Sequence, residues 1–149
     1  MNDRFERFSA IVAEISYNLH KIAMQATEKY GLKGPYAIYL LTLYRYEEGV
    51  TAAKLCELCH RDKSDVSRAV AMMVKSGLLE RESDTPYRSR LRLTELGRES
   101  AQELRTLVEK AVAVIDLDVD EDERETMYAA LGKISSSLRL IGDGRISLE

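Results

Sequence analysis

One segment, residues 51–97, constrains the fold of this chain more than any other part. Within it, Asp62 has a side-chain oxygen that can accept the free amide hydrogens of a first helical turn. Gly77 tolerates the left-handed conformation in which many helices end. We therefore predict a helix between these two residues. The residues from Thr51 onward predict a shorter helix before it, and a turn joins the two.

The predicted helix has one apolar and one polar face. Apolar residues recur at the spacing of a helix face at Val66, Val70, Met73 and Val74. The opposite face carries Ser64, Ser67, Arg68, Ala71 and Lys75. In a DNA major groove, arginine recognises guanine, and alanine contacts the thymine methyl group. Serine can hydrogen-bond to a donor or to an acceptor on a base edge. The alternative is an ordinary polar face that contacts only water.

The residues after this helix predict a basic hairpin. Its strands are expected at residues 78–83 and 87–93, on either side of a turn at Asp84, Thr85 and Pro86. A period of two places Arg88, Arg90 and Arg92 on one side of the second strand. Leu91 and Leu93 then face inward. An arginine row beside the helix suits a phosphate backbone, and this arrangement favours DNA contact over a merely solvated face.

Two helices, a turn and a hairpin in this order predict a winged helix-turn-helix. The chain resembles the MarR family of bacterial winged-helix transcription regulators over nearly its whole length. The resemblance rests on DKSDVSRAVAMMVKSGLL, Asp62–Leu79, and on LRLTELG, Leu91–Gly97, with a long first helix and two long terminal helices around them. Two positions depart from the family pattern. Asp65 stands where family members commonly have Thr or Ser. Family wings usually carry an Asp-x-Arg motif, but no arginine lies two residues after Asp84 in this chain.

The resemblance implies a fold that is mainly α with a small β wing, in a single domain over residues 1–149. Residues 34–97 are the expected winged helix-turn-helix part, called the head below, and residues 1–33 and 98–145 are the expected dimerisation helices. The expected contacts to double-stranded DNA are Lys63, Ser64, Asp65, Ser67, Arg68, Lys75, Arg88 and Arg90.

Long helical segments outside the hairpin carry apolar stripes. The first helix is expected to end near Gly31, the second to run from Pro35 to about Gly49, and the last two to begin at Thr94 and Asp120. The stripe of the first helix consists of Phe5, Phe8, Val12, Ile15, Leu19, Ile22 and Ala26. Such stripes need a partner surface, and the resemblance favours a two-fold homodimer whose recognition helices enter major grooves about 34 Å apart. Packing within one chain is the alternative.

The aromatic residues suggest where an effector binds. The chain has 8 Tyr, 2 Phe and no Trp, and tyrosine combines an apolar ring with a polar tip. The resemblance implies a site for a small amphipathic or phenolic ligand between the dimer helices and the head. Its candidate residues are Tyr17, His20, Met24, Tyr36 and Tyr39. The alternative is that these side chains are ordinary core or boundary residues.

The sequence CELCH, from Cys56 to His60, suggests a metal or thiol sensor at first sight. A structural zinc site needs four protein ligands and a catalytic one three. Cys56, Cys59 and His60 supply three, and His20 is a fourth only if the fold brings it near. We instead expect small buried cysteines, no disulfide, no metal and no cofactor, with metal or thiol sensing as the alternative.

The distribution of charge and the absence of catalytic motifs limit the functions that this chain can have. The formal net charge is -3, but residues 61–92 carry eight cations and five acids, a net of +3. Acidic residues concentrate between Asp116 and Glu125, a solvated helix–helix junction by our interpretation. No phosphate loop, hydrolase elbow or metalloprotease motif is present. We expect a cytoplasmic regulator with no enzymatic activity and no membrane partner, and a protein-binding winged-helix module is the rival.

Overall fold

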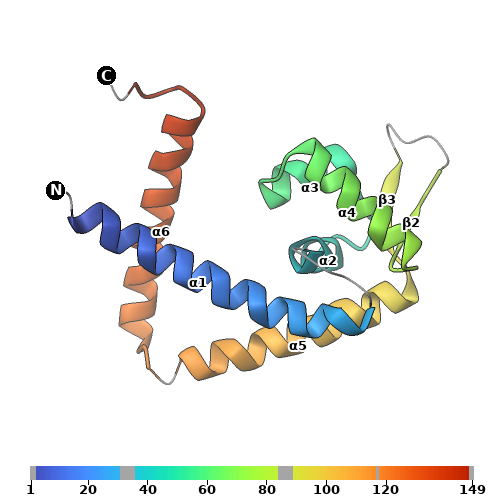
Figure 1. Ribbon diagram of the computed structural model, residues 1–149, viewed down its shortest axis with the longest axis horizontal. Coiled ribbons are helices and arrows are strands. Elements are labelled where there is room, and N and C mark those ends of the chain that lie inside the picture. Colours follow the sequence, from blue (N-terminus) through green and yellow to red (C-terminus); the bar gives the residue numbers. More distant parts are fainter. Residues whose placement is uncertain (1–2, 31–35, 84–88, 117, 148–149) are drawn as a thin grey trace. The chain divides into compact units, whose positions relative to one another are not determined.

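The computed structural model describes residues 3–30, 36–83, 89–116 and 118–147 (Figure 1). It is mainly α with a small sheet, which confirms the predicted fold class. The elements are α1 (Asp3–Thr27), the 3-10 helix η1 (Glu28–Tyr30), α2 (Tyr36–Tyr44), β1 (Val50–Thr51), α3 (Ala52–Cys59), α4 (Lys63–Lys75), β2 (Leu79–Arg81), β3 (Arg90–Leu93), α5 (Glu95–Ile115) and α6 (Glu121–Gly142).

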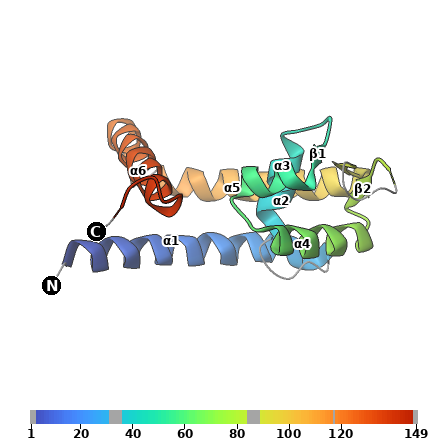
Figure 2. The same cartoon turned by 90° about the horizontal axis from the view of Figure 1, so that it is seen from above.

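The chain forms two compact units, Met1–Glu109 and Lys110–Glu149, whose boundary falls inside α5. Within the first unit, α2, α3, α4 and the hairpin of β2 and β3 gather near the first turns of α5 (Figure 1). The view from above shows the same grouping (Figure 2). Both expected helices of the helix-turn-helix, α3 and α4, are therefore present beside a wing.

The sheet is antiparallel with the order β1-β3-β2. Its central strand pairs Leu91 with Val50 on one side, and Leu93 with Leu79 on the other. Leu91 and Leu93 are buried, as the period of two predicted. The short strand β1 was not predicted, because two residues are too few to show an alternating pattern. It ties the segment before α3 to the wing.

The core of the head packs the inner faces of the three short helices against the sheet and α5. Its largest fully buried side chains include Tyr39, Leu40, Leu55, Met73, Leu78, Leu91 and Leu104. Burying each such side chain contributes roughly 1.5–3 kcal/mol. Val66, Val70 and Met73 of α4 face this core as predicted. Val74 was assigned to the same face and is exposed instead, since Ala69 occupies the inner position.

Helix α2 ends at Tyr44, and the prediction that it continues to about Gly49 was wrong. Two turns follow the helix, in which the amides of Arg45 and Tyr46 donate to the carbonyls three residues back. Gly49 then takes a φ of +76°, and a Cβ there would lie 2.7 Å from the carbonyl oxygen of Leu91. Glycine thus lets the chain turn tightly and reach β3 as a strand.

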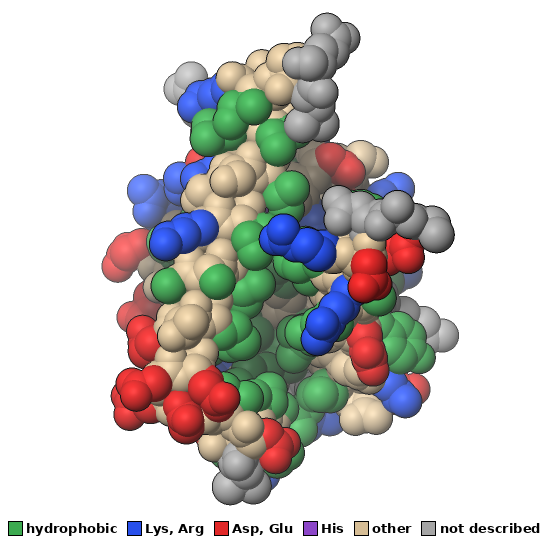
Figure 3. Space-filling model, turned by 90° about the vertical axis from the view of Figure 1, so that its left-hand side faces the viewer, with side chains coloured by type: hydrophobic (Ala, Val, Ile, Leu, Met, Phe, Trp, Pro, Cys, Tyr) green, Lys and Arg blue, Asp and Glu red, His purple; other side chains and the backbone are tan. Residues whose placement is uncertain are grey.

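The second unit contains α6, which opens with the predicted capping box. The Asp120 side chain accepts from the amide of Glu123, and the Glu123 side chain accepts from the amide of Asp120. Figure 3 shows hydrophobic side chains along this helix and a gathering of acidic side chains at its lower end. Among the described residues, α6 has no buried side chain. None of the described helices combines the length and the apolar character needed to cross a membrane.

Candidate nucleic-acid interface

The start and end of α4 follow local backbone chemistry. The Asp62 Oδ1 atom accepts from the Asp65 amide at 2.7 Å, so Asp62 is the predicted N-cap. After the helix, Gly77 takes a φ of +72°, the left-handed conformation expected there. Both predicted limits of the recognition helix are confirmed.

The outer face of α4 carries the side chains that the periodicity assigned to it. Lys63, Ser64, Ser67, Arg68, Ala71 and Lys75 are all exposed. The side chain of Arg68 is 73% exposed, and its long stem can extend to a base edge without rearrangement of the core. This face presents hydroxyl, methyl and cationic groups together, which are the groups that distinguish base pairs in a major groove.

Asp65 was predicted with these contacts, but it lies partly inside the head. Its side chain is 27% exposed, and its Oδ2 atom accepts a hydrogen bond from the Tyr39 hydroxyl at 3.2 Å. Arg61 and Arg68 lie near the same carboxylate, at 3.9 and 3.8 Å. Asp65 thus faces protein groups from α2 and α4, and the periodicity of α4 alone does not reveal this.

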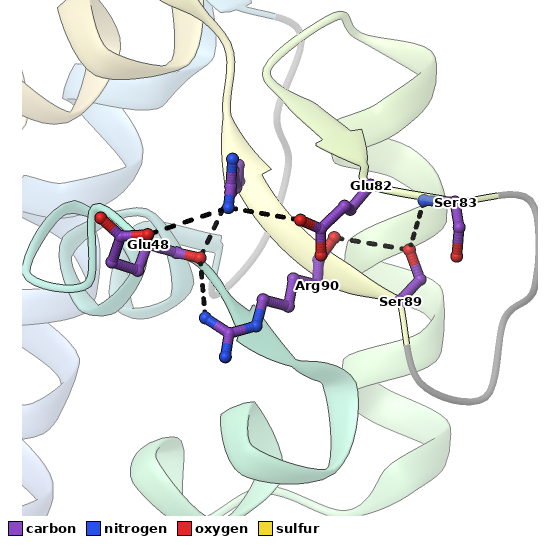
Figure 4. A network of polar contacts seen from close by, with 6 residues as sticks. Glu48, Glu82, Ser83, Ser89 and Arg90 are labelled. Atoms are coloured by element: carbon purple, nitrogen blue, oxygen red, sulfur yellow. Dashed lines mark hydrogen bonds and ion pairs between the residues drawn. The ribbon is translucent and has the colours of Figure 1, made fainter.

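Two of the three arginines predicted to form a row on the wing are described, and Arg88 lies outside the described residues. Arg90 turns toward Glu48 in the turn before β1 (Figure 4), and Arg92 bonds to the same residue. The Arg90 Nη1 and Arg92 Nε atoms each donate to the Glu48 carbonyl oxygen at 3.2 Å. Arg92 also forms an ion pair with Glu82 at 3.4 Å. The wing therefore uses the Arg92 side chain to bind the adjoining turn, a role that the period of two did not predict.

Arg90 is a better candidate for a phosphate contact than Arg92. Arg90 is exposed, and among the described residues its side chain donates from Nη1 to a neutral carbonyl group. A guanidinium has five N–H donors, so most of its donor capacity remains for a ligand. At the wing's open end, the Ser89 hydroxyl accepts from the Ser83 amide at 3.1 Å (Figure 4). This hydrogen bond links the residues on either side of the segment 84–88.

The five predicted effector residues lie in different surroundings. Tyr17, His20 and Met24 are exposed on α1, Tyr36 is half-buried at the start of α2, and Tyr39 is fully buried in the core of the head. None of them lines a small cavity of about 110 Å³ at the end of α2. That cavity is lined by Leu43, Tyr44, Tyr46, Glu47, Leu93 and Arg98. Sequence reasoning missed it, since its walls come from three segments.

One of the two cysteines is buried as predicted, and the other is half-buried. Cys59 is buried and its thiol donates to the Thr42 hydroxyl at 3.4 Å, while Cys56 is half-buried. Burial raises the pKa of the Cys59 thiol, which disfavours the reactive thiolate. Among the residues that the structure describes, no three His, Cys, Asp or Glu side chains are grouped to hold a metal ion. Cys56, Cys59 and His60 therefore do not assemble the metal site considered as an alternative.

Known structures share this fold. The chain is similar to MepR of S. aureus in a complex with DNA, with 23% identity and a TM-score of 0.79, covering 88% of this chain and 97% of MepR. It is also similar to a MarR transcriptional regulator from Methanosarcina mazei Go1, with 19% identity and a TM-score of 0.78, covering 95% and 94%. A MarR-family regulator from Rhodococcus sp. RHA1 has 17% identity and a TM-score of 0.73, covering 90% and 97%. No curated protein matches the chain.

The sequence of the head is similar to one protein family. The model of the MarR family matches residues 30–88, which include α2, the whole helix-turn-helix and β2. The solved structures share the fold over 88% and 95% of this chain. The helix boundaries, the sheet order and the outward polar face of α4 all fit this similarity. Residues 30–88 are thus similar to the MarR family, and the chain shares the winged helix-turn-helix fold of the solved MarR-family regulators.

Proposed function

We propose that the protein is a homodimeric repressor that binds a pseudo-palindromic operator through α4 and the wing. The observation that carries this proposal is the outer face of α4, where Ser64, Ser67 and Arg68 are exposed on a helix anchored by its opposite face. MepR, which shares the fold, has been solved with DNA. The DNA contacts proposed for this chain are Lys63, Ser64, Ser67, Arg68 and Lys75 of α4, with Arg90 and Arg88 of the wing. We propose no enzymatic activity, and action in the cytoplasm.

The experiment that tests this proposal is selection of bound sequences from random duplex DNA by the purified protein. We expect a pseudo-palindrome whose half-sites lie about one helical turn apart. Binding of the selected duplex should weaken steeply with salt, because lysine and arginine contacts release counterions from phosphate. If no sequence is enriched and only weak, salt-sensitive binding remains, the proposal is wrong and a protein-binding module becomes the better explanation.

The dimer in this proposal is supported by apolar side chains that one chain leaves exposed. On α1 these include Phe5, Val12, Ile15 and Leu19, and on α6 they include Met127, Leu131, Ile134 and Leu138. Each helix by itself thus presents an apolar surface of the kind that marks an interaction site. A second copy of the chain covers such surfaces most economically, and a two-fold dimer also duplicates the recognition helix.

Replacing Leu138 with aspartate should weaken this dimer. Leu138 is 56% exposed on α6, and a carboxylate in an apolar interface loses its hydration without a partner. We expect the dimer dissociation constant to rise at least about tenfold, or about 1.4 kcal/mol. Sedimentation measurements over a concentration series give the constant. Ser136→Asp adds the same charge on another face of α6 and should leave it nearly unchanged. Equal effects of the two substitutions would contradict an interface on the apolar face.

Arg90 and Arg92 provide a matched test of the wing. We expect Arg90→Gln to weaken binding to operator and random DNA alike and to reduce the salt slope by about 1, because one phosphate contact is lost. Arg92→Gln should leave the slope unchanged, since Arg92 is bound to Glu48 and Glu82 within the protein. Fluorescence anisotropy titrations at several salt concentrations give both slopes. A normal slope for Arg90→Gln would exclude Arg90 from phosphate contact.

We further propose that a small amphipathic or phenolic effector controls DNA binding. Tyr17, His20, Met24 and Tyr36 are accessible on α1 and at the start of α2, and they combine aromatic, thioether and imidazole groups. An effector that binds one arrangement of the dimer more tightly shifts the population toward it. If that arrangement separates the two recognition helices by the wrong spacing, the operator is released.

A further inference from the structure

The carboxylate of Asp65 joins the core of the head to the DNA-facing surface of α4. Its Oδ2 atom accepts from the Tyr39 hydroxyl at 3.2 Å and lies 3.9 Å from Arg61. The other oxygen, Oδ1, lies 3.8 Å from the Arg68 guanidinium. One side of the carboxylate therefore contacts a core residue of α2. The other side faces the arginine that we expect to contact a base.

Tyr39 lies on the core side of this contact. It is fully buried, and burial raises its pKa to about 12, assisted by the negative charge of Asp65 and by the hydrogen bond to it. The phenol therefore stays protonated and acts as a donor at physiological pH. A buried hydroxyl without an acceptor is costly, so the Tyr39 ring constrains where the Asp65 carboxylate lies.

The backbone of Asp65 is fixed as well. Its amide donates to the Asp62 side chain at 2.7 Å, which places Asp65 in the first turn of α4. The positive end of the helix dipole favours a carboxylate at this position. Because both the amide and the carboxylate of Asp65 have defined partners, its Oδ1 atom places a negative charge one turn before Arg68.

We propose that Tyr39 and Asp65 are positioning residues that set the direction of the Arg68 side chain before DNA binds. This inference rests on the proposed role of Arg68 in base recognition. Arg68 is 73% exposed, and an arginine without a nearby partner loses much rotamer freedom when it binds. A fixed carboxylate beside it restricts the side chain in advance. Part of the operator specificity is thereby determined by a hydrogen bond inside the head, between α2 and α4.

Tyr39→Phe and Asp65→Asn test this inference by binding measurements with the selected operator and with random DNA. The quantity to compare is the ratio of the two affinities. Since ion pairs at exposed sites are weak, we expect each variant to lower this ratio by about two- to fivefold. An unchanged ratio in both folded variants would overturn the inference. Circular dichroism shows whether each variant folds. Tyr39→Phe removes a single oxygen atom, so this variant alone tests the inference if Asp65→Asn does not fold.

Asp65→Asn also removes a negative charge close to the DNA, and this change should tighten binding to any duplex. Glu57→Gln on α3 makes the same charge change, and the partner of Glu57 is Lys54 rather than Arg68. In this control, both affinities should rise together and their ratio should stay constant. A fall of the ratio in Glu57→Gln equal to that in Asp65→Asn would show a general charge effect and would overturn the inference.

The same measurements in an Arg68→Ala background separate the inference from the proposed function. If the pair acts through Arg68, Tyr39→Phe and Asp65→Asn lower the ratio no further once Arg68 is absent. Full losses in that background would contradict a positioning role. If Arg68→Ala alone leaves the ratio unchanged, base recognition by Arg68 fails. If Arg68→Ala lowers the ratio but neither partner substitution does, only the positioning inference fails.

Discussion

Replacing Gly97 with alanine is expected to destabilise the protein by roughly 1–3 kcal/mol, because the added methyl group overpacks a tight contact. Gly97 is buried in the first turn of α5, and its Cβ would collide with the carbonyl oxygen of Leu78 and approach a methyl group of Leu93. That same oxygen accepts from the Thr94 amide at 3.1 Å. The Thr94 hydroxyl in turn donates to the Gly77 carbonyl and accepts from the Gly97 amide. A methyl group at this point therefore pushes the start of α5 away from the end of the recognition helix.

Gly132 of α6 provides the matched control. A Cβ at this helical glycine meets no heavy atom of the described residues within 4 Å. Alanine is the better helix former, so Gly132→Ala should stabilise the protein by about 0.5–1 kcal/mol. Urea denaturation at a fixed protein concentration gives both values. If the two substitutions change the free energy of unfolding in the same direction, the close approach of α5 to Leu78 does not limit the residue at position 97.

Replacing Arg68 with alanine is expected to cost about 1–3 kcal/mol of binding free energy on the selected operator and to relax the preference at one base position. The reason is that Arg68 extends from the anchored recognition helix and forms bidentate hydrogen bonds with guanine in the proposed complex. The folded state should lose little, since the only partner that the structure records for Arg68 among the described residues is Asp65 at 3.8 Å, an exposed ion pair.

Selection of DNA sequences by the Arg68→Ala variant reveals the relaxed position directly. Arg105→Ala removes the same charge from α5, where Arg105 pairs with Glu109, and it should leave the selected sequence unchanged. An Arg68→Ala variant that selects the same operator with the same preference would exclude Arg68 from base recognition. Equal weakening on all sequences would assign it to phosphate instead.

The predictions that the structure confirmed depend on neighbours along the chain. Asp62 caps α4, Asp120 and Glu123 form a capping box, and Leu91 and Leu93 face the core. Each of these features joins residues no more than four positions apart, or follows from the period of one element. The same periodicity assigned the polar side chains of α4 to the exposed face. The recognition helix was therefore predictable in its limits and in its orientation.

The polar side chains that the sequence placed wrongly or incompletely have partners far along the chain. Tyr39 and Asp65 are 26 residues apart, and Arg90 and the Glu48 carbonyl are 42 apart. In the sequence, Asp65 on its helix and Arg90 on its strand both appear available to bind DNA. Neighbouring residues do not show which distant group of the protein each side chain will contact. Val74 was misassigned for a related reason, since it lies at the edge of the apolar stripe, where the neighbouring elements decide what is covered.

The sequence by itself determined the order of the elements, the limits of α4 and the residues that it exposes, because caps and periodicity act over one or two turns of backbone. Only the tertiary structure decided which of the charged residues are engaged within the protein. A hydrogen bond from α2 to α4 joins Tyr39 to Asp65, and the pairing of β1 with β3 brings the turn that carries Glu48 to Arg90 and Arg92. These contacts depend on the three-dimensional meeting of distant segments, which local interactions do not encode.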